Sequence, residues 1–249
     1  VGGAFIGAFG LERGIRLAFV AALAMAVVAA IAQQYLIDDD RKSAPPGDEP
    51  HINPWRCWPL LNASLKRLLV ADILVRFCEQ IPYAFVVVWA VGTKDQPGPI
   101  SELQFGTLRA IEMATAILVY IPVAAMADRM GKKPFVVLTF GFFTLFPLVL
   151  LFSTSYLLLI VAFVIRGLKE FGEPARKAMI VDLAPEGRKA SVFGLYYLIR
   201  DTIVSVAAFG GAFLWQASPT VNLLTAFGFG VLGTLWFAWK GRDVAPAAA

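Results

Sequence analysis

Ionisable side chains interrupt several long apolar stretches of this sequence. Six of them fall near the middle of such stretches and nearly balance in sign: Arg76, Glu79, Glu112, Arg166, Arg200 and Asp201. A charge at the centre of a bilayer costs at least about 2.5–3.5 kcal/mol, so such residues normally face a bundle interior or a wet cavity, where they are paired. These groups could bind a charged solute or carry a proton, or they could fix helix packing as buried ion pairs. Asp72 and Arg109 lie within one turn of Arg76 and Glu112, so pairs can also form along one helix.

The composition identifies the environment of these charges. Apolar residues make up 58% of the 249 residues, charged residues make up 16%, and the mean hydropathy is +0.69. These values are typical of integral membrane proteins. The net charge of +4 comes from short basic segments between apolar runs, without a basic and aromatic surface, which argues against nucleic-acid binding.

Seven stretches are long and apolar enough to cross a bilayer as helices, which takes about 20 residues. They are residues 17–36, 67–92, 103–126, 134–153, 155–178, 190–215 and 220–240. The predicted fold class is therefore all-α, a polytopic membrane helical bundle. The apolar residues 1–10 are too short to cross and the chain begins at Val1, so we expect the end of a further helix and a missing N-terminal portion.

The positions of Lys and Arg predict the orientation. Twelve of these residues lie in one set of alternate connections and three in the other. Because positive charges accumulate in cytoplasmic loops, residues 37–66, 128–133 and 185–189 and the C-terminus are predicted to be cytoplasmic. We expect a multi-pass protein of a bacterial cytoplasmic (inner) membrane, in contact with membrane lipids.

Residues that often form metal or catalytic sites are few and scattered. His51 and Cys57 lie in the long polar connection 37–66, and Cys78 lies within a predicted span. No GxSxG, HExxH, Walker or CxxC pattern is present, so we expect no enzyme activity, no metal and no cofactor.

Charged residues divide the predicted spans into two kinds. Residues 67–92, 103–126, 155–178 and 190–215 contain them, whereas 17–36, 134–153 and the body of 220–240 do not. The four charged spans are predicted to surround a shared polar cavity, with the uncharged spans facing lipid or supporting them. Glu170, Glu173, Arg176 and Lys177 lie nearer the cytoplasmic end, where pairing at the interface or snorkelling is expected, and Pro174 predicts a kink or a helix end.

Two segments resemble the major facilitator superfamily of secondary transporters. The segment "ADRMGKKP" resembles the family's signature in the cytoplasmic loop after the second helix of each six-helix half, with Ala124 where the family prefers Gly. Residues 166–195 resemble the family's fourth or tenth helix and the turn that follows it, with the pattern carried by Pro185, Glu186, Arg188 and Gly194. The matching signature residues are Asp128, Arg129, Gly131, Lys132 and Lys133.

The resemblance also implies a domain organisation. Residues 1–36 would be the end of the fifth helix and the sixth helix of an N-terminal half that is otherwise missing, and 37–66 the central cytoplasmic loop. Residues 67–240 would form the C-terminal six-helix bundle and 241–249 a cytoplasmic tail. The chain would thus be one six-helix half with one or two helices of the other half, and the missing half would be its partner.

The resemblance further implies secondary active transport of a small solute by alternating access, as symport or antiport with protons. The predicted substrate and proton pathway consists of Asp72, Arg76, Glu79, Arg109, Glu112, Arg166, Arg200 and Asp201, with Glu79 or Glu112 as the proton carrier. The predicted cytoplasmic gate consists of Asp128, Arg129, Gly131, Lys132, Lys133, Pro185, Glu186 and Arg188. The substrate could be an organic anion, a zwitterion or an amphipathic drug. A transporter-like receptor or scaffold, or a lipid-handling membrane protein without gradient-driven transport, is the alternative.

Overall fold

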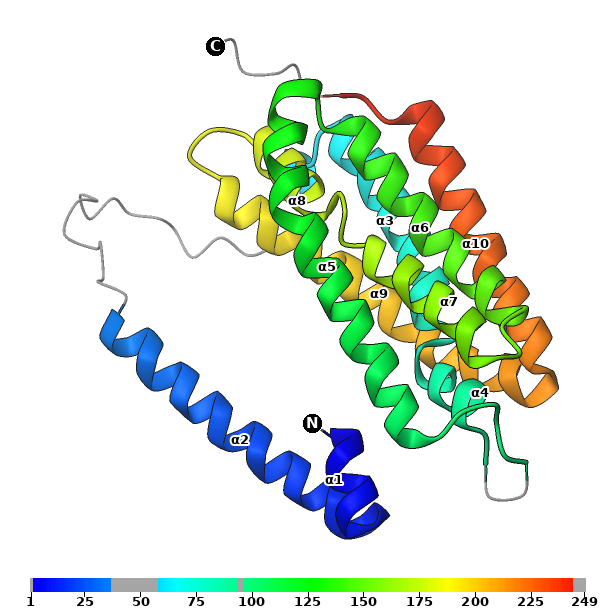
Figure 1. Ribbon diagram of the computed structural model, residues 1–249. Coiled ribbons are helices and arrows are strands. Elements are labelled where there is room, and N and C mark those ends of the chain that lie inside the picture. The colour runs from blue at the N-terminus through cyan, green and yellow to red at the C-terminus, as the bar shows by residue number, and fades with distance from the viewer. Residues whose placement is uncertain (1, 37–57, 94–95, 244–249) are drawn as a thin grey trace. The chain divides into compact units, whose positions relative to one another are not determined.

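The computed structural model describes residues 2–36, 58–93 and 96–243, and for residues 2–4, 7, 11, 121, 124, 125, 128 and 129 it describes the backbone alone. These ranges consist of helices and their connections, with no β-strand, which confirms the all-α fold class (Figure 1). His51, Cys57 and most of the predicted central loop lie outside the described residues. The chain divides into two units, one containing α1, α2 and residues 101–107, the other containing the remaining helices.

The first unit is a helical hairpin. Helix α1 (Gly2–Phe9) packs against α2 (Leu11–Leu36), and Gly10 joins them with φ of 77°. A Cβ on Gly14 would lie 2.5 Å from the Cα of Ile6, so glycine permits the close approach of the two helices. Helix α2 begins at Leu11 instead of the predicted residue 17, and it has the length and apolar composition of a membrane span.

Each predicted span after residue 66 corresponds to one helix or to a succession of shorter helices. In chain order these elements are α3 (Ala63–Gln80), η3 (Tyr83–Phe85), α4 (Val86–Val91), α5 (Glu102–Met130), α6 (Lys133–Leu151), α7 (Tyr156–Leu168), α8 (Glu173–Leu183), α9 (Lys189–Ala217) and α10 (Pro219–Lys240).

Helix α3 begins at Ala63, earlier than the predicted residue 67, because Asn62 caps it. The Asn62 side chain accepts a hydrogen bond from the backbone N–H of Leu65 at 2.9 Å and donates one to the carbonyl oxygen of Leu183 at 2.8 Å. An N-cap of this kind satisfies a backbone donor that has no partner within the helix. The same side chain therefore starts α3 and ties it to the end of α8.

Two spans that the sequence predicts as continuous are interrupted. Helix α3 ends at Gln80, and Pro82, which has no backbone N–H to continue the ladder, precedes η3 and α4. Helix α7 ends at Leu168, and α8 begins at Glu173 with Pro174 in its first turn, where proline is well tolerated. The expected effect of Pro174 is present, but the helix ends before the proline instead of at it.

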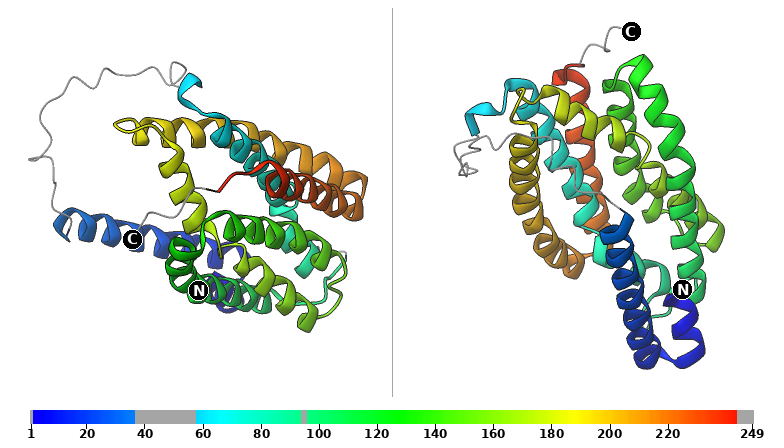
Figure 2. Two further views of the ribbon diagram at one scale, coloured as in Figure 1. Left: turned by 90° about the horizontal axis from the view of Figure 1, so that it is seen from above. Right: turned by 90° about the vertical axis from the view of Figure 1, so that its left-hand side faces the viewer.

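Helices α3, α6 and α10 pack side by side, and α9 lies against α3 (Figures 1 and 2). Glycines in α10 allow this packing. A Cβ on Gly230 would lie 2.6 Å from Thr144 Oγ1, and one on Gly233 would lie 2.8 Å from a methyl group of Val75. Helices α6 and α10 thus support α3, which contains three of the charged residues described below, Asp72, Arg76 and Glu79.

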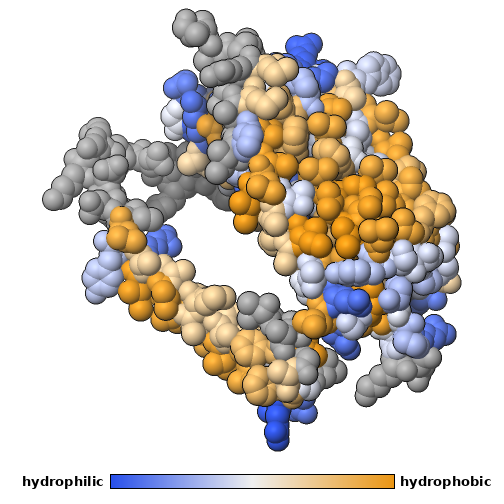
Figure 3. Space-filling model, viewed as in Figure 1, coloured by the Kyte–Doolittle hydropathy of each residue, from blue (hydrophilic) through white to orange (hydrophobic). Residues whose placement is uncertain are grey.

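The outer surface of the second unit is apolar. Figure 3 shows apolar residues gathered over α6, α7 and α10, with hydrophilic residues at the two ends of these helices. Within the described ranges of both units, five helices are long and apolar enough to cross a membrane, counting α3 through α4 as one and including α2. The predicted span 155–178 is not among them, because it is divided between α7, of 13 residues, and α8, of 11 residues.

Candidate functional site

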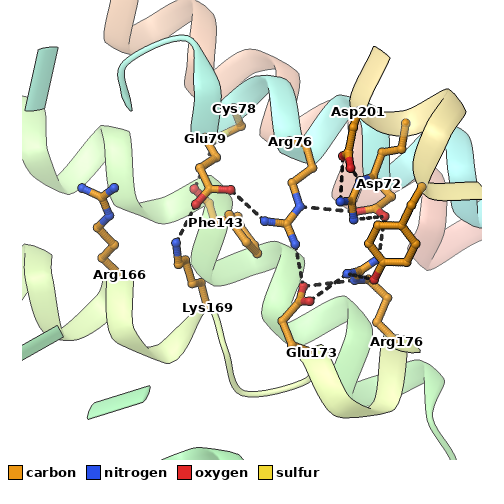
Figure 4. A network of polar contacts seen from close by, with 12 residues as sticks. Asp72, Arg76, Cys78, Glu79, Phe143, Arg166, Lys169, Glu173, Arg176 and Asp201 are labelled. Atoms are coloured by element: carbon orange, nitrogen blue, oxygen red, sulfur yellow. Dashed lines mark hydrogen bonds and ion pairs between the residues drawn. The ribbon is translucent and has the colours of Figure 1, made fainter. Parts of the chain in front are cut away.

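Asp72 of α3 is the centre of a buried network of charged side chains (Figure 4). Its Oδ2 accepts hydrogen bonds from Arg176 Nη1 at 2.6 Å, from the Tyr196 hydroxyl at 3.0 Å and from Arg200 Nη1 at 3.4 Å. Its Oδ1 lies 3.6 Å from Arg76 Nε, an ion-pair contact without a hydrogen bond. The Asp72 side chain is 1% exposed, so its charge is stabilised by these groups instead of by water.

Glu173, in the first turn of α8, joins two of the same arginines. Arg176 Nε and Nη2 donate to the two oxygens of Glu173 at 3.0 and 2.7 Å, a bidentate pair. Arg76 Nη2 donates to Glu173 Oε1 at 2.9 Å. Bidentate arginine–carboxylate pairs are among the stronger charge-assisted hydrogen bonds. Arg76 and Arg176 therefore tie α3 to α8 through two carboxylates, Asp72 and Glu173.

Glu79 continues the network toward α7. It accepts a hydrogen bond from Arg76 Nη1 at 2.8 Å and one from Lys169 Nζ at 2.5 Å. At the opposite end, Arg200 of α9 pairs with Asp201 at 2.7 Å and lies over the Tyr197 ring at 4.1 Å. We call the joined residues the central charge network: Asp72, Arg76, Glu79, Lys169, Glu173, Arg176, Arg200 and Asp201.

A second group of charges connects α5 and α7. Arg166 Nε lies 3.2 Å from Glu112 Oε1, both side chains are buried, and Arg109 donates a hydrogen bond to the other oxygen of Glu112. The guanidinium of Arg166 lies over the ring of Phe146 at 4.9 Å, a favourable cation–π geometry. We call Arg109, Glu112 and Arg166 the Glu112 cluster.

The two groups meet at a small cavity. Glu79 and Lys169 of the network and Arg166 of the Glu112 cluster line it together with three phenylalanines of α6. The cavity volume is about 10 Å³, about the space for one water molecule. The sequence predicts a shared polar cavity, whereas in this structure most of the charged groups pair with one another and leave little open space.

Local backbone features place these side chains. The break between α7 and α8 ends in Gly172, whose N–H donates to the Thr139 hydroxyl of α6, and a Cβ on Gly172 would lie 2.2 Å from the Phe135 carbonyl oxygen. The break is thereby held against α6. A Cβ on Gly167 would lie 2.6 Å from the Glu112 carbonyl oxygen and from Thr115 Cβ, so glycine also permits the contact of α7 with α5.

All eight residues predicted for the pathway take part in one of the two groups. Six of them are largely buried, whereas the side chains of Asp201 and Arg109 are 60% and 39% exposed. The structure adds Lys169, Glu173 and Arg176, and it adds Tyr196 as a hydrogen-bond donor.

Glu173 and Arg176 pair with each other, one of the two roles expected for them, but they do not extend outward as snorkelling side chains would. Both are buried, Arg176 with 1% exposure, because the new helix that begins after the break directs them toward α3. Their spacing of three residues, which places them on one face of a helix, is the signal that could have identified them. Lys177, predicted in the same group, is exposed.

The predicted gate residues lie at the C-terminal ends of α5 and α8 and in the turns that follow these helices. Gly131, with φ of 88°, turns the chain from α5 into α6, and Lys132 pairs with Asp182 of α8. Asp243, after α10, accepts hydrogen bonds from the backbone N–H groups of Lys132 and Lys133 at 3.0 and 3.1 Å. The side chains of Asp128 and Arg129 lie outside the described part.

The other predicted gate residues form a separate exposed turn. The side chain of Glu186 is 95% exposed and pairs with Lys189, and the backbone N–H of Arg188 donates to the carbonyl oxygen of Pro185. Among the described side chains, no ion pair joins residues 185–188 to residues 131–133.

Residues suited to metal binding or nucleophilic chemistry do not gather in the described ranges. These ranges contain no group of three His, Cys, Asp or Glu side chains arranged to hold a metal ion. Cys78 is buried in α3, and its thiol donates to the carbonyl oxygen of Phe143 at 3.3 Å.

Comparison with known proteins gives one family. The family model described as Major Facilitator Superfamily matches residues 74–248, which include the Glu112 cluster, the 131–133 turn and all of the central charge network except Asp72. Comparisons with curated proteins and with solved structures give no significant match.

Proposed function

Since this chain belongs to the major facilitator superfamily and is an integral multi-pass membrane protein of a transporter family, we propose that it takes part in secondary active transport of a small solute. Transport would proceed by alternating access and would be coupled to a proton gradient. The observation that carries this proposal is the burial of the central charge network and the Glu112 cluster across α3, α5, α7, α8 and α9.

The pairing pattern supports a role in conformational change. Arg76 contacts three carboxylates and Asp72 contacts three arginines, so each could exchange one partner without losing all compensation of its charge. Buried pairs with alternative partners give a packed bundle more than one stable arrangement, which alternating access requires. Solute and proton binding would then favour one set of pairs over another.

Glu112 is the carboxylate that we propose to carry the proton. It has one buried arginine partner, Arg166, and one partly exposed partner, Arg109. Neutralising Asp72 would instead leave the three arginines that surround it without their shared carboxylate. Protonation therefore disturbs fewer ion pairs at Glu112 than at Asp72.

The charge balance favours an anionic solute. The two groups together contain six cations and five carboxylates. The cavity between them carries two cations, Lys169 and Arg166, against one carboxylate, Glu79, with phenylalanine rings on its walls. We propose that the solute is a small organic anion with an apolar part, bound after these groups separate.

The positions of the basic residues and the family support the remaining proposals. Residues 67–240 would form the C-terminal six-helix bundle, working with an N-terminal half to which residues 1–36 belong. The 131–133 turn and the C-terminus would face the cytoplasm, in a bacterial inner membrane. The predicted gate residues, Asp128 and Arg129 among them, would stabilise one state at that side.

Transport by the full-length protein in proteoliposomes tests these proposals. With an imposed pH gradient and a panel of organic anions, zwitterions and cations, we expect an anion to change the internal pH reported by a trapped dye. Glu112→Gln should abolish this proton flux, whereas Glu102→Gln, a matched change at an exposed position of the same helix, should preserve it. If no solute moves protons, the receptor or scaffold alternative is favoured; if Glu112→Gln transports normally, Glu112 is not the carrier.

A further inference from the structure

The segment after α10 runs back to the turn between α5 and α6 (Figure 1). One oxygen of the Asp243 carboxylate accepts hydrogen bonds from the backbone N–H groups of Lys132 at 3.0 Å and of Lys133 at 3.1 Å. Gly241, the residue after α10, allows the chain to leave the helix in this direction, because a Cβ there would lie 2.4 Å from the carbonyl oxygen of Phe237. A residue beyond the last helix thus reaches the start of α6.

The start of α6 has no cap from its own sequence. Its N-cap residue is Lys132, whose side chain has no acceptor and forms no capping hydrogen bond. The first N–H groups of a helix have no partner within that helix, and the positive end of the helix dipole favours a carboxylate there. Asp243 provides both the acceptor and the negative charge.

The turn is shaped to receive this carboxylate. Gly131 has φ of 88°, a conformation that favours glycine. A Cβ at this position would lie 2.5 Å from Asp243 Oδ2, so glycine is needed for the contact as well as for the turn. Successive N–H groups in a turn of this kind form a concave site for an anion. The 131–133 turn and the Asp243 carboxylate are therefore complementary.

The 131–133 turn directly follows two predicted gate residues. Asp128 and Arg129 belong to the last turn of α5, which ends at Met130. Helix ends open more readily than helix interiors, so these two residues keep a fixed position only if the turn after them is held. The Lys132 ammonium pairs with Asp182 of α8, and Asp243 binds the backbone of the same turn.

We propose that Asp243 is a positioning residue of the cytoplasmic gate. Residues 241–243, which we call the C-terminal strap, hold the 131–133 turn in the shape that directs the end of α5 toward its gate partners. Without the strap, the end of α5 and the start of α6 open more often, and the gate stabilises its state less well. This inference rests on the proposed function, because it assumes that the gate takes part in transport.

Hydrogen exchange of the full-length protein, followed by mass spectrometry, tests the strap without any solute. Asp243→Ala removes both acceptor oxygens at an exposed position, so exchange at the Lys132 and Lys133 amides should become about fivefold faster, the effect of a lost N-cap. Asp243→Asn should remain within about twofold of the wild type, because asparagine caps helices about as well as aspartate. Glu102→Ala, at an exposed carboxylate in the first turn of α5, is the matched control and should have no effect on these amides.

A second variant tests the same contact from the side of the turn. Gly131→Ala places a Cβ against the Asp243 carboxylate and should also accelerate exchange at the Lys132 and Lys133 amides. In a protein that already carries Asp243→Ala, the same change should accelerate exchange by a smaller factor, because the carboxylate that it displaces is gone. Equal factors in the two backgrounds would contradict a direct contact between Gly131 and Asp243.

Transport separates a role in the gate from a purely structural cap. In the proteoliposome assay with an imposed pH gradient, Asp243→Ala should lower the maximal proton flux at an unchanged KM, because the strap acts on the change of state and not on solute binding. Asp243→Asn should restore the flux, and Glu102→Ala should leave it as in the wild type.

Each outcome has a separate meaning. Unchanged exchange at the two amides in Asp243→Ala would overturn the strap. Faster exchange with a normal proton flux would make Asp243 a structural cap only and overturn its role in the gate. If the wild-type protein moves no protons with any solute, the proposed function fails and the gate role fails with it, while the exchange result still decides whether Asp243 holds the turn.

Discussion

The replacement of Arg176 by methionine tests whether the central charge network holds the bundle together. Methionine fills much of the same volume, but it removes the hydrogen bonds to Asp72 at 2.6 Å and to both oxygens of Glu173 at 3.0 and 2.7 Å. Removal of one partner from a buried pair costs about 3–5 kcal/mol. Because Arg76 still contacts both carboxylates, we expect the free energy of unfolding to fall by about 3 kcal/mol.

The assay is reversible unfolding of the purified protein in mixed micelles, with increasing fractions of a denaturing detergent. Lys177→Met, a neighbouring change at an exposed position, is the matched control and should change the unfolding free energy by less than about 0.5 kcal/mol. Addition of Glu173→Gln to Arg176→Met should recover part of the loss, since one of the uncompensated carboxylates is then neutral. Equal effects of the Arg176 and Lys177 replacements would refute the network as a source of stability.

Two further predictions concern the backbone. Gly167→Ala should lower the free energy of unfolding by about 1–3 kcal/mol, because the added Cβ would lie 2.6 Å from atoms of α5. Gly194→Ala, whose added Cβ would have no atom within 4 Å, should be neutral or slightly stabilising in the same assay. Asn62→Ala should lower the free energy of unfolding by about 1 kcal/mol, because the cap of α3 is lost, and it should increase hydrogen exchange at the Leu65 amide. An unchanged exchange rate at this amide would contradict the role of the cap.

The helices and their apolar surfaces follow from the sequence because each depends on a local pattern. A run of about 20 apolar residues predicts a helix wherever it packs, and the spans 134–153 and 220–240 correspond closely to α6 and α10. The two interruptions were harder to locate. A proline in the sequence indicates that a helix is disfavoured nearby. The position of the second break, however, depends on Gly172, which fits against the carbonyl oxygen of Phe135, and Phe135 is distant in the sequence.

The candidate site was predicted in part. Depth within a span identified Arg76, Glu112, Arg166 and Arg200, since depth depends only on position along a helix. Depth did not join Glu173 and Arg176 to this group, because the direction of a side chain after the break near Pro174 does not follow from its position along the chain. The break before α8 turns these side chains toward Asp72.

The sequence by itself determined that this chain is a helical membrane protein of a transporter family, since hydropathy and a short signature are local properties of the chain. Only the tertiary structure decided which charges are partners. Arg176 and Asp72 are separated by 104 residues, and Arg200 and Asp72 by 128. Ion pairing depends on a few ångströms of separation, and that separation is set by how glycines, caps and helix breaks let the helices approach one another.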